Sequence, residues 1–499
     1  MGARGGAALV CAMAAAVGCA RERASGPQLS IAVATDVVSL DPHLQNDLAT
    51  QAILGNLYEA LVSFDADMRV LPALAERWES PDELTWRFRL REASFHDGRK
   101  MSARDVVFSL HRAARDPKSK MSGYLATMRE ARTVGARMVE ITTVRSYPIL
   151  LNKLAVVAIV PDGSPAEIRE PVGTGAYRLA RRAPGESVEL EAFEGYWGGM
   201  AAERRARFLV VPDLARRVDL LRQGEVDLVS RLGVEEFSRV QAAPGCRVAS
   251  RPGLTVYNLG ARVDRAPLSD VRLRRAIDLA LDRPAMVRAL LGGRGIPVGQ
   301  SISPPVFGYA PDIAPTERDL AAARRLVAAA GFPDGVELTL EHASTVASYG
   351  AVIAGQLGEA GFRVKTTVWP WTEFYQRLLA GHPDFFIVGF TCDTADATDM
   401  LDLVLHSRDP GAGYGAHNFS HYANPRFDLI LQRSGETPRV AERLDLLRDA
   451  IRVAKEDLPL IPLFALESAY GMRDDLAWEP RLDQKLHVYP MRRSTKHFR

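Results

Sequence analysis

The sequence predicts an α/β protein, because segments that alternate like β-strands and segments with helical periodicity follow one another from Leu29 almost to the C-terminus. Apolar residues make up 47% and charged residues 25% of the 499 residues, the balance of a soluble globular chain. This length corresponds to roughly three domains or one large body of two lobes. No low-complexity segment divides the chain, so we expect lobes that are joined by crossing strands and not by a flexible linker.

The first elements alternate between strand and helix. Residues 29–42 predict a buried strand that leads into an Asp-Pro turn, and residues 48–62 have the apolar spacing of a helix. Apolar and polar residues alternate strictly over 84–91, which predicts a half-exposed antiparallel strand. A turn is expected at Asp97-Gly98, and Ser102 is expected to cap the helix after it.

The same patterns continue through the rest of the chain. Further strands are predicted at residues 138–144, 186–193, 205–212 and 254–260. Further helices are predicted at residues 214–224, 270–282, 318–331, 348–361 and 439–457.

The charges of the chain indicate no general attraction to nucleic acid. The 63 Lys and Arg residues exceed the 61 Asp and Glu residues by two, and the two signs are interspersed. Nucleic-acid-binding domains instead gather basic residues on one face. We therefore expect no nucleic-acid partner.

The N-terminal nineteen residues have the pattern of an export signal. Arg4 precedes a run of small apolar residues that is shorter than the roughly 20 needed to span a membrane. The run ends in Ala16-Val17-Gly18-Cys19, which resembles the bacterial lipobox, although Leu usually stands where Ala16 does. The resemblance implies that residues 1–18 are a lipoprotein signal peptide and that Cys19 carries a lipid, the sole membrane contact. The alternative is a signal peptide that is cut elsewhere.

Few patterns in the chain suggest catalysis or metal binding. The phosphate-loop, zinc-protease, nucleophile-elbow and dinucleotide signatures are missing from the sequence. His417 and His421 are spaced like zinc ligands on a helix, but the Asn and Pro residues around them predict a loop. His96 and Asp97 could form a catalytic dyad, but they fall in a predicted solvated turn. We therefore expect a binding protein without catalytic residues, cofactor or metal, with a secreted hydrolase as the alternative from another class.

Eight blocks between Ile31 and Tyr470 share, in order, the motifs of one family. They are Leu40–Ser80 with LDP and YEALV, Leu84–Leu110 with FHDG and DVVFS, Pro171–Leu179 (PVGTGAYRL), Leu220–Val229, Ala266–Arg283, the helix ends AAAGF and GEAGF, Asn418–Asp428, and Leu458–Phe464. Together they resemble the solute-binding proteins of peptide-type ABC importers, the dipeptide, oligopeptide and nickel group. The turn PVGTGAY departs from the family in one place, where Ala176 replaces the usual Pro.

The resemblance implies a periplasmic-binding-protein-like fold, with two lobes around a ligand cleft and an extra domain on the first lobe. Carried over, the first lobe comprises residues 19–45, 170–258 and 473–499. The extra domain is expected at 46–169 and the second lobe at 259–472. The crossings between the lobes are expected near 258–262 and 470–473, where they act as hinges.

The resemblance also implies one charged contact with the ligand. Peptide-binding members use a GWxxD segment, whose Asp pairs with the α-ammonium of the peptide, and the matching segment here is Gly389-Phe390-Thr391-Cys392-Asp393. Asp393 is expected to keep the carboxylate and Phe390 an aromatic wall, with Thr391 and Cys392 beside them. A helix or turn cap is the alternative role for Asp393.

Two further segments match the cleft of the family. Asn46, Asp47 and Leu48 follow the LDP turn and match a stretch that lines the cleft. Arg262 stands where the family has an Asn near the hinge, and its guanidinium suits a ligand carboxylate or phosphate. A solvated arginine is the alternative, and an arginine that does bind ligand would speak against a plain peptide.

The function that the resemblance implies is capture of a peptide or related small solute for an ABC importer. The expected partners are the permease and ATPase subunits, and the expected form is a lipid-anchored monomer in the cell envelope, on the periplasmic or extracellular face of a membrane. A non-peptide ligand (a nickel chelate, haem, an opine or an oligosaccharide) and a role as a signalling receptor are the alternatives, because one fold serves many functions.

Overall fold

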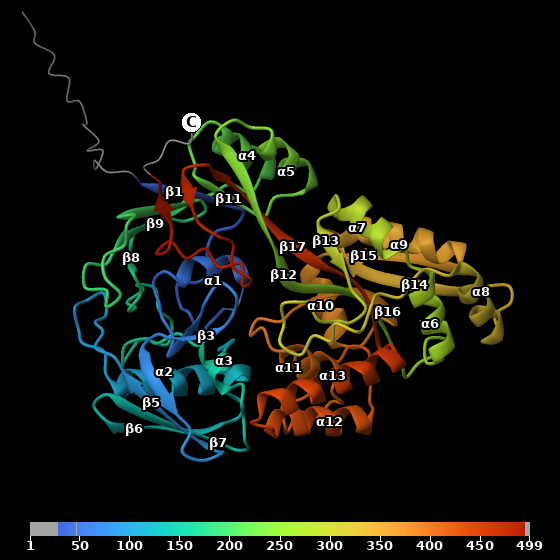
Figure 1. The fold of residues 1–499 in the computed structure, drawn as a ribbon, viewed down its shortest axis with the longest axis horizontal. Coiled ribbons are helices and arrows are strands. Elements are labelled where there is room, and N and C mark those ends of the chain that lie inside the picture. The colour runs from blue at the N-terminus through green and yellow to red at the C-terminus, as the bar shows by residue number, and fades with distance from the viewer. Residues whose placement is uncertain (1–27, 46, 495–499) are drawn as a thin grey trace, which may run out of the picture.

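The structure is a computed structural model that describes residues 28–45 and 47–494, and it shows a two-lobed arrangement around long shared strands (Figure 1). The principal sheet has eleven strands. In spatial order these are β15 (Phe362–Trp369), β14 (Val336–Ala343), β16 (Phe385–Thr391), β12 (Cys246–Ala261), β17 (Leu460–Arg473), β11 (Leu228–Ser230), β1 (Leu29–Val33), β10 (Arg205–Val210), β9 (Ser187–Ala192) and β8 (Tyr177–Ala183), with β13 (Gly295–Pro297) paired to β17. We call the body around β1 and β8–β11 the first lobe and the body around β14–β16 the second lobe.

The remaining strands form small antiparallel sheets. A four-stranded sheet contains, in spatial order, β4 (Ala75–Glu79), β5 (Thr85–Leu90), β7 (Met138–Thr143) and β6 (Met128–Gly135). Two hairpin-like pairs are β2 (Val62–Phe64) with β3 (Val70–Pro72), and β18 (Leu476–Ala477) with β19 (Arg492–Arg493). The four-stranded sheet packs with α2 (Ala103–Arg115) and α3 (Leu150–Leu154) around one apolar core, and we call this body the extra domain.

Helices cover both lobes. Those of the first lobe are α1 (Leu48–Leu54), α4 (Leu214–Arg222) and α5 (Val234–Gln241). Those of the second lobe are α6 (Val271–Ala280), α7 (Arg283–Leu291), α8 (Leu320–Ala329), α9 (Ala347–Glu359), α10 (Trp371–Leu379), α11 (Thr398–Met400), α12 (Pro425–Glu436) and α13 (Val440–Asp457). Short turns of 3₁₀ or π type are η1 (Ser122–Leu125), η2 (Ser344–Val346) and η3 (Leu401–Leu405).

Most of the predicted elements are confirmed. The four predicted later strands correspond to β7, β9, β10 and β12, and the five predicted later helices to α4, α6, α8, α9 and α13. Ser102 caps α2 as expected, and a capping box with Asp105 completes the helix start. The helix predicted over 48–62 is shorter, because α1 ends at Leu54. The carbonyls of Asn56 and Leu57 accept hydrogen bonds from Tyr177 and Gly175, so tertiary contacts replace the helical ones.

The same helix differs from the prediction in its surroundings. Apolar side chains of residues 52–58 pack in the core of the first lobe, together with Val160 and Ile168. These segments fall inside the range that the sequence assigned to the extra domain. The core of the extra domain instead gathers residues 61–159.

Strands β12 and β17 pass from one lobe to the other as an antiparallel ribbon (Figure 1). At one end Met472 and Tyr470 of β17 pair with β11 of the first lobe, and at the other end β12 pairs with β16 of the second lobe. The pairing between β12 and β17 is irregular between Pro252 and Val256 and again between Tyr257 and Asn258. Pro252 has no N–H to donate, and proline in a sheet is found at such irregularities. The second irregularity lies at the edge of the predicted crossing at 258–262, and the role of this stretch as a hinge stays a prediction.

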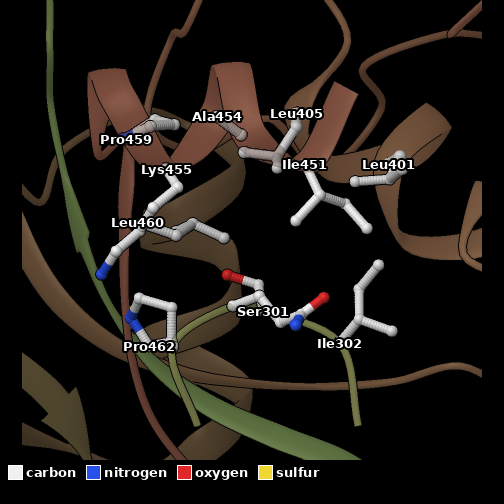
Figure 2. A pocket seen from close by; sticks show the side chains of 12 residues that line it. Ser301, Ile302, Leu401, Leu405, Ile451, Ala454, Lys455, Pro459, Leu460 and Pro462 are labelled. Carbon is white, nitrogen blue, oxygen red and sulfur yellow. The ribbon is translucent and has the colours of Figure 1, made fainter. Parts of the chain in front are cut away.

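A cavity of about 20 Å³ lies in the second lobe, between the loop at Ser301 and helix α13 (Figure 2). Apolar side chains such as Ile302, Leu405 and Ile451 point into it. A space of this size holds about one water molecule, since a water needs roughly 10–15 Å³ by this measure. The cavity is therefore too small for a solute.

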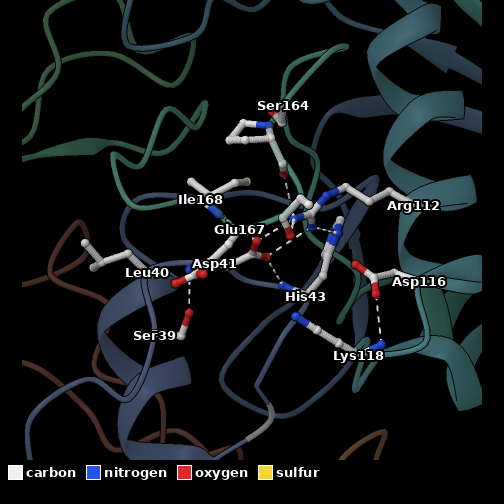
Figure 3. Close-up of polar contacts among 12 residues, drawn as sticks. Ser39, Leu40, Asp41, His43, Arg112, Asp116, Lys118, Ser164, Glu167 and Ile168 are labelled. Carbon is white, nitrogen blue, oxygen red and sulfur yellow. Dashed lines mark hydrogen bonds and ion pairs between the residues drawn. The ribbon is translucent and has the colours of Figure 1, made fainter.

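The LDP turn is tied to the extra domain by a buried ion pair (Figure 3). Asp41 is fully buried, and both of its carboxylate oxygens accept hydrogen bonds from Arg112 of α2. The backbone N–H groups of His43 and Ile168 donate to the same carboxylate at 2.9 and 3.0 Å. Burial alone would raise the pKa of Asp41, but Arg112 and these donors outweigh it and lower the pKa. The LDP turn and the helix that begins with the DVVFS motif thus meet in one polar cluster, through Arg112.

The turns FHDG and GTGAY are also joined. His96 Nε2 donates to the Gly175 carbonyl at 3.0 Å, and its Nδ1 accepts from Gly173 N–H at 3.3 Å. Burial lowers the pKa of His96 to about 4, so the ring is neutral at neutral pH. The interpretation of FHDG as a solvated turn is wrong for His96, because the imidazole is half-buried between the two turns.

Gly173 and Gly175 allow this turn to lie directly on the backbone after α1. A methyl group at Gly173 would overlap the carbonyl oxygen of Leu57, and one at Gly175 would overlap that of Asn56. Both glycines are therefore required by close approach of backbone to backbone.

Gly173→Ala is expected to destabilise the fold by about 1–3 kcal/mol, because the backbone carbonyl opposite it cannot move aside. Denaturant unfolding followed by circular dichroism measures the change. Gly123→Ala is the matched control, since a methyl group there meets no atom within 4 Å. Equal unfolding midpoints for the two variants would contradict the packing argument.

Candidate functional site

Two adjoining cavities lie between the lobes. The small cavity has a volume of about 270 Å³ and the large cavity of about 540 Å³, the scale of small-molecule sites, which measure roughly 300–1,000 Å³. Leu48, Thr391 and Gln484 line both. The small cavity is further lined by Gln51, Met121, Tyr124, Val156, Leu254, Asp393, Leu482, Asp483 and Lys485. Its walls therefore come from both lobes and from the extra domain.

Asp393 faces the small cavity from the loop after β16. The N–H of Cys392 donates to the Leu254 carbonyl at 3.2 Å, which anchors this loop to the crossing strands. The side chain of Asp393 is open to the cavity yet surrounded by protein, and the loss of hydration together with the charge of Asp399 raises its pKa to about 7. Tyr124 of the extra domain forms a hydrogen bond with it, and no basic side chain in the described ranges forms an ion pair with it. Asp393 is thus a carboxylate that an ammonium group would stabilise.

The segment after the LDP turn contributes one side chain to the cavities. Leu48 lines both of them. Asp47 caps α1 by accepting the Thr50 N–H at 2.9 Å, and it is not among the residues that line either cavity. Asn46 lies outside the described residues.

Phe390 and Cys392 do not face these cavities, in contrast to the prediction. Side chains alternate along β16, so Gly389 and Thr391 face the cavities while Phe390 faces the opposite side. There the Phe390 ring stacks on Phe419, with 6.4 Å between ring centroids. Cys392 packs in a core of the second lobe, where burial raises its thiol pKa. Neither residue is retained in the candidate site.

Arg262 is also displaced from the role that the sequence suggested. Its guanidinium is buried and forms a paired contact with the Asp264 carboxylate, with both N–O distances at 2.8 Å. Its remaining NH group donates to the Gly381 carbonyl at 2.6 Å. Protein groups already accept hydrogen bonds from these donors, so Arg262 stabilises a turn of the second lobe. It lines neither cavity and therefore does not face the space for the ligand.

The C-terminal segment supplies part of the site that the sequence did not indicate. Asp483 and Lys485 line the small cavity. Burial would raise the pKa of Asp483, but its hydrogen bonds to Arg481, at 2.9 and 2.7 Å, outweigh it and lower the pKa to about 2. A family motif that extended beyond residue 470 would have pointed to this segment, and the recognised motifs end before it.

The large cavity contains one basic residue, Arg231, that the sequence analysis did not predict as a site residue. Arg231 lines this cavity, is exposed to it, and forms no ion pair or hydrogen bond with the residues that the structure describes. Its backbone has a φ of 60°, in the left-handed region that non-glycine residues rarely adopt. Trp371 lines the same cavity from the second lobe and stacks on Tyr375.

The extra domain and the second lobe touch beside the small cavity. Lys153 Nζ and Asp399 Oδ1 form an ion pair at 2.5 Å, with both side chains almost fully buried. Asn152 donates to the Thr394 carbonyl at 3.0 Å. Burial opposes the charge on Lys153, but Asp399 outweighs it and raises the Lys153 pKa. These contacts hold the loop that carries Asp393 against the extra domain.

The described part of the chain contains no group of three or more His, Cys, Asp or Glu residues placed to hold a metal ion. His417 lies 3.3 Å from the Tyr375 hydroxyl, whereas His421 lies against Arg262 and Asp264. The two histidines that offered the alternative metal site thus have separate partners. No helix among residues 28–45 and 47–494 combines the length and apolar character needed to cross a bilayer.

Comparison with known proteins identifies relatives along most of the chain. The family model of bacterial extracellular solute-binding proteins, family 5 Middle, matches residues 69–412. The chain is 26% identical over 445 residues to the dipeptide-binding protein of Escherichia coli strain K12, covering 81% of this chain and 83% of that protein. It is 27% identical over 461 residues to the glutathione-binding protein GsiB of Escherichia coli O1:K1, covering 87% and 88%.

Solved structures share the fold. The ABC transporter-associated periplasmic binding protein DppA of Helicobacter pylori, in complex with the peptide STSA, matches with a TM-score of 0.82 at 23% identity, over 94% of this chain and 98% of that chain. AgaA of Agrobacterium tumefaciens R10, in complex with agropinic acid, matches with a TM-score of 0.80 at 23% identity, over 94% and 99%. These matches confirm the predicted two-lobed periplasmic-binding-protein-like fold. The predicted class is confirmed as well: the chain belongs to the bacterial extracellular solute-binding proteins of family 5, which are binding proteins of ABC importers and not enzymes.

Proposed function

We propose that this protein is a lipid-anchored monomer that captures a short peptide or a related small solute in the cleft between its lobes and delivers it to an ABC permease and ATPase. The ligand's ammonium group pairs with Asp393, and Thr391 and Leu48 line the space beside it. The observation that carries this proposal is the carboxyl group of Asp393 in an interlobe cavity, which forms no ion pair with a basic residue of the described chain and has a pKa of about 7. The peptide and glutathione ligands in the names of relatives support the same class of solute.

Native mass spectrometry of the purified protein, followed by dissociation of the complex, tests the ligand class. We expect co-purifying masses of short peptides in the wild type and loss of these masses in Asp393→Asn. Disruption of the gene is expected to abolish uptake of the same peptides by cells. A bound opine, metal chelate, haem or sugar would contradict the peptide ligand, normal uptake would favour a sensor, and release of cleaved products without a transporter would indicate a hydrolase.

Cys19→Ser is expected to move the protein from the membrane fraction to the soluble fraction, because two acyl chains on Cys19 give stable anchoring. Fractionation of cells and immunoblotting measure the distribution. Cys11→Ser is the matched control, since Cys11 lies in the same apolar run but outside the Ala16–Cys19 motif. A Cys19→Ser variant that stays in the membrane fraction at the wild-type level would contradict the lipid anchor.

A further inference from the structure

Lys485 is a basic residue that lines the same cavity as Asp393, and it also lines a neighbouring cavity of about 330 Å³ that contains Glu59. It lies in the C-terminal segment after β18, whereas Asp393 belongs to the second lobe. Residues 486–491 pack with the first lobe, since Leu486, Val488 and Met491 belong to its core, whereas Leu482 packs in the same core as Cys392. The small cavity therefore has a carboxylate from the second lobe and, facing it, an ammonium group from the C-terminal segment, which enters the first-lobe core directly after Lys485.

The ammonium group of Lys485 has no partner of its own. Lys485 Nζ forms neither an ion pair nor a hydrogen bond with the residues that the structure describes. The neighbouring carboxylate, Asp483, is occupied by Arg481 and by the backbone N–H of Lys485. Asp393 is too far away to form an ion pair with it, although the two charges attract each other.

A buried charge without a partner costs free energy, which a ligand of opposite charge can recover. Burial lowers the pKa of Lys485, and the carboxylates of Asp483 and Asp393 only partly oppose this. An anionic group that enters the cavity would meet three N–H donors on this side chain. The same ligand would meet the Asp393 carboxylate with its cationic group.

We propose that Lys485 binds the carboxylate of the solute whose ammonium group is bound by Asp393, so that the cleft selects zwitterions and each lobe supplies one of the two charges. This inference rests on the function proposed above and adds a specificity-determining residue to it. A ligand with both charges links the lobes through two ionic contacts, whereas a ligand with one charge leaves the other lobe's charge unpaired. Ligands with a single charge are therefore disfavoured because one charged residue of the cavity stays unpaired, and zwitterions are favoured because both residues are paired.

The experiment offers a peptic digest of casein to the immobilised full chain and identifies retained peptides by mass spectrometry. One portion of the digest is untreated, one is acetylated at its amines, and one is methyl-esterified at its carboxyl groups. Only peptides without Lys, Asp and Glu are scored, so that each modification changes one terminal charge. The wild type is expected to retain untreated peptides and to lose at least tenfold in retention after either modification.

Lys485→Gln is expected to retain untreated peptides at least tenfold less well than the wild type and to show little further loss on esterification, because the two changes remove the same contact. Lys485→Arg is expected to restore retention, since it keeps the charge. Lys365→Gln, which alters an exposed lysine on β15, is the matched control and should behave as the wild type.

Retention of esterified peptides at the untreated level, with loss of acetylated ones, would overturn the role of Lys485 and leave the proposed function intact. The same holds if insensitivity to esterification arises in Arg231→Gln and not in Lys485→Gln, since the carboxylate then lies in the large cavity. No retention of any peptide by the wild type would overturn the peptide function and this inference with it. The ester comparison on the wild type decides whether the carboxylate matters even if Lys485→Gln does not fold.

Discussion

Asp393→Asn is expected to weaken binding of an amine-bearing solute by about 30- to 4,000-fold. Removing one partner of a desolvated charge pair leaves the other unpaired, which costs about 2–5 kcal/mol, and 1.4 kcal/mol is tenfold in affinity. Isothermal titration calorimetry with the solute identified by native mass spectrometry measures the loss. Acetylation of the amine should weaken binding to the wild type by a similar factor and have little further effect on the variant.

The affinity of the wild type for the solute is expected to fall as the pH is lowered below about 7. The pKa of Asp393 in the empty cavity is about 7, raised by burial and by Asp399. Below this pH the carboxyl group holds a proton that must leave before an ammonium group can pair with it, so affinity should fall by up to about tenfold per pH unit. The charged neighbours Asp399, Lys485 and Lys153 and the hydroxyl of Tyr124 face the same carboxyl group. Asp393→Asn should abolish this dependence.

The stability of the empty protein separates binding from folding. Because the folded-state pKa of Asp393 lies above its unfolded value, the stability that its protonated form contributes is lost as pH rises through about 7. At pH 8 the melting temperature of Asp393→Asn should therefore equal or exceed that of the wild type. Asp445→Asn, at an exposed position of α13, is the matched control. If Asp393→Asn does not fold, Asp393 has the alternative role of a helix or turn cap. If its affinity for the solute is unchanged, the amine of the solute binds elsewhere.

Lys153→Met is expected to lower the affinity for the solute by about 100-fold or more, through the balance between open and closed lobes. Breaking a buried ion pair by removing one partner costs about 3–5 kcal/mol, because the remaining charge stays buried. Asp399 would then lie uncompensated near Asp393 and Asp402. Separation of the extra domain from the second lobe returns Asp399 to water, so the variant should favour the open form. Small-angle scattering at saturating ligand should show a larger radius of gyration than in the wild type.

A double variant provides the control for this contact. Lys153→Met combined with Asp399→Asn removes both charges and should recover most of the affinity, because no buried charge is left unpaired. An unchanged scattering profile and unchanged affinity in Lys153→Met, with only a lower melting temperature, would mean that the pair stabilises the fold without controlling closure.

Helix starts and tight turns could be predicted from the sequence because they depend on residues that are adjacent in the chain. Ser102 starts α2 because a cap needs only its own side chain and the next turn, and the PVGTGAY turn follows from its glycines. The end of α1 could not be predicted in the same way. It is determined by hydrogen bonds from Gly175 and Tyr177, more than a hundred residues further along the chain.

The candidate site was predictable where a motif places a residue at the end of a strand. Asp393, Thr391 and Leu48 line the cavities, and their contact with a ligand stays a prediction of the family resemblance. Phe390 was misplaced because a one-residue step along a strand turns the side chain to the other face. Lys485 and Arg231 could not be predicted as site residues, because neither belongs to a motif of the family. They reach the cleft only through the folding of the chain.

The ribbon of β12 and β17 also has a consequence for the order in which the two lobes can fold. Cys246 pairs with Arg473, 227 residues later, and the second lobe lies between these partners. A chain that emerges from its N-terminus can complete the second lobe while the first still lacks Trp478 and Val488 from its core. Such a long closure makes folding slow and leaves apolar surface exposed in the interval. The cleft between the lobes is therefore complete only when residues 475–494 have joined the first lobe.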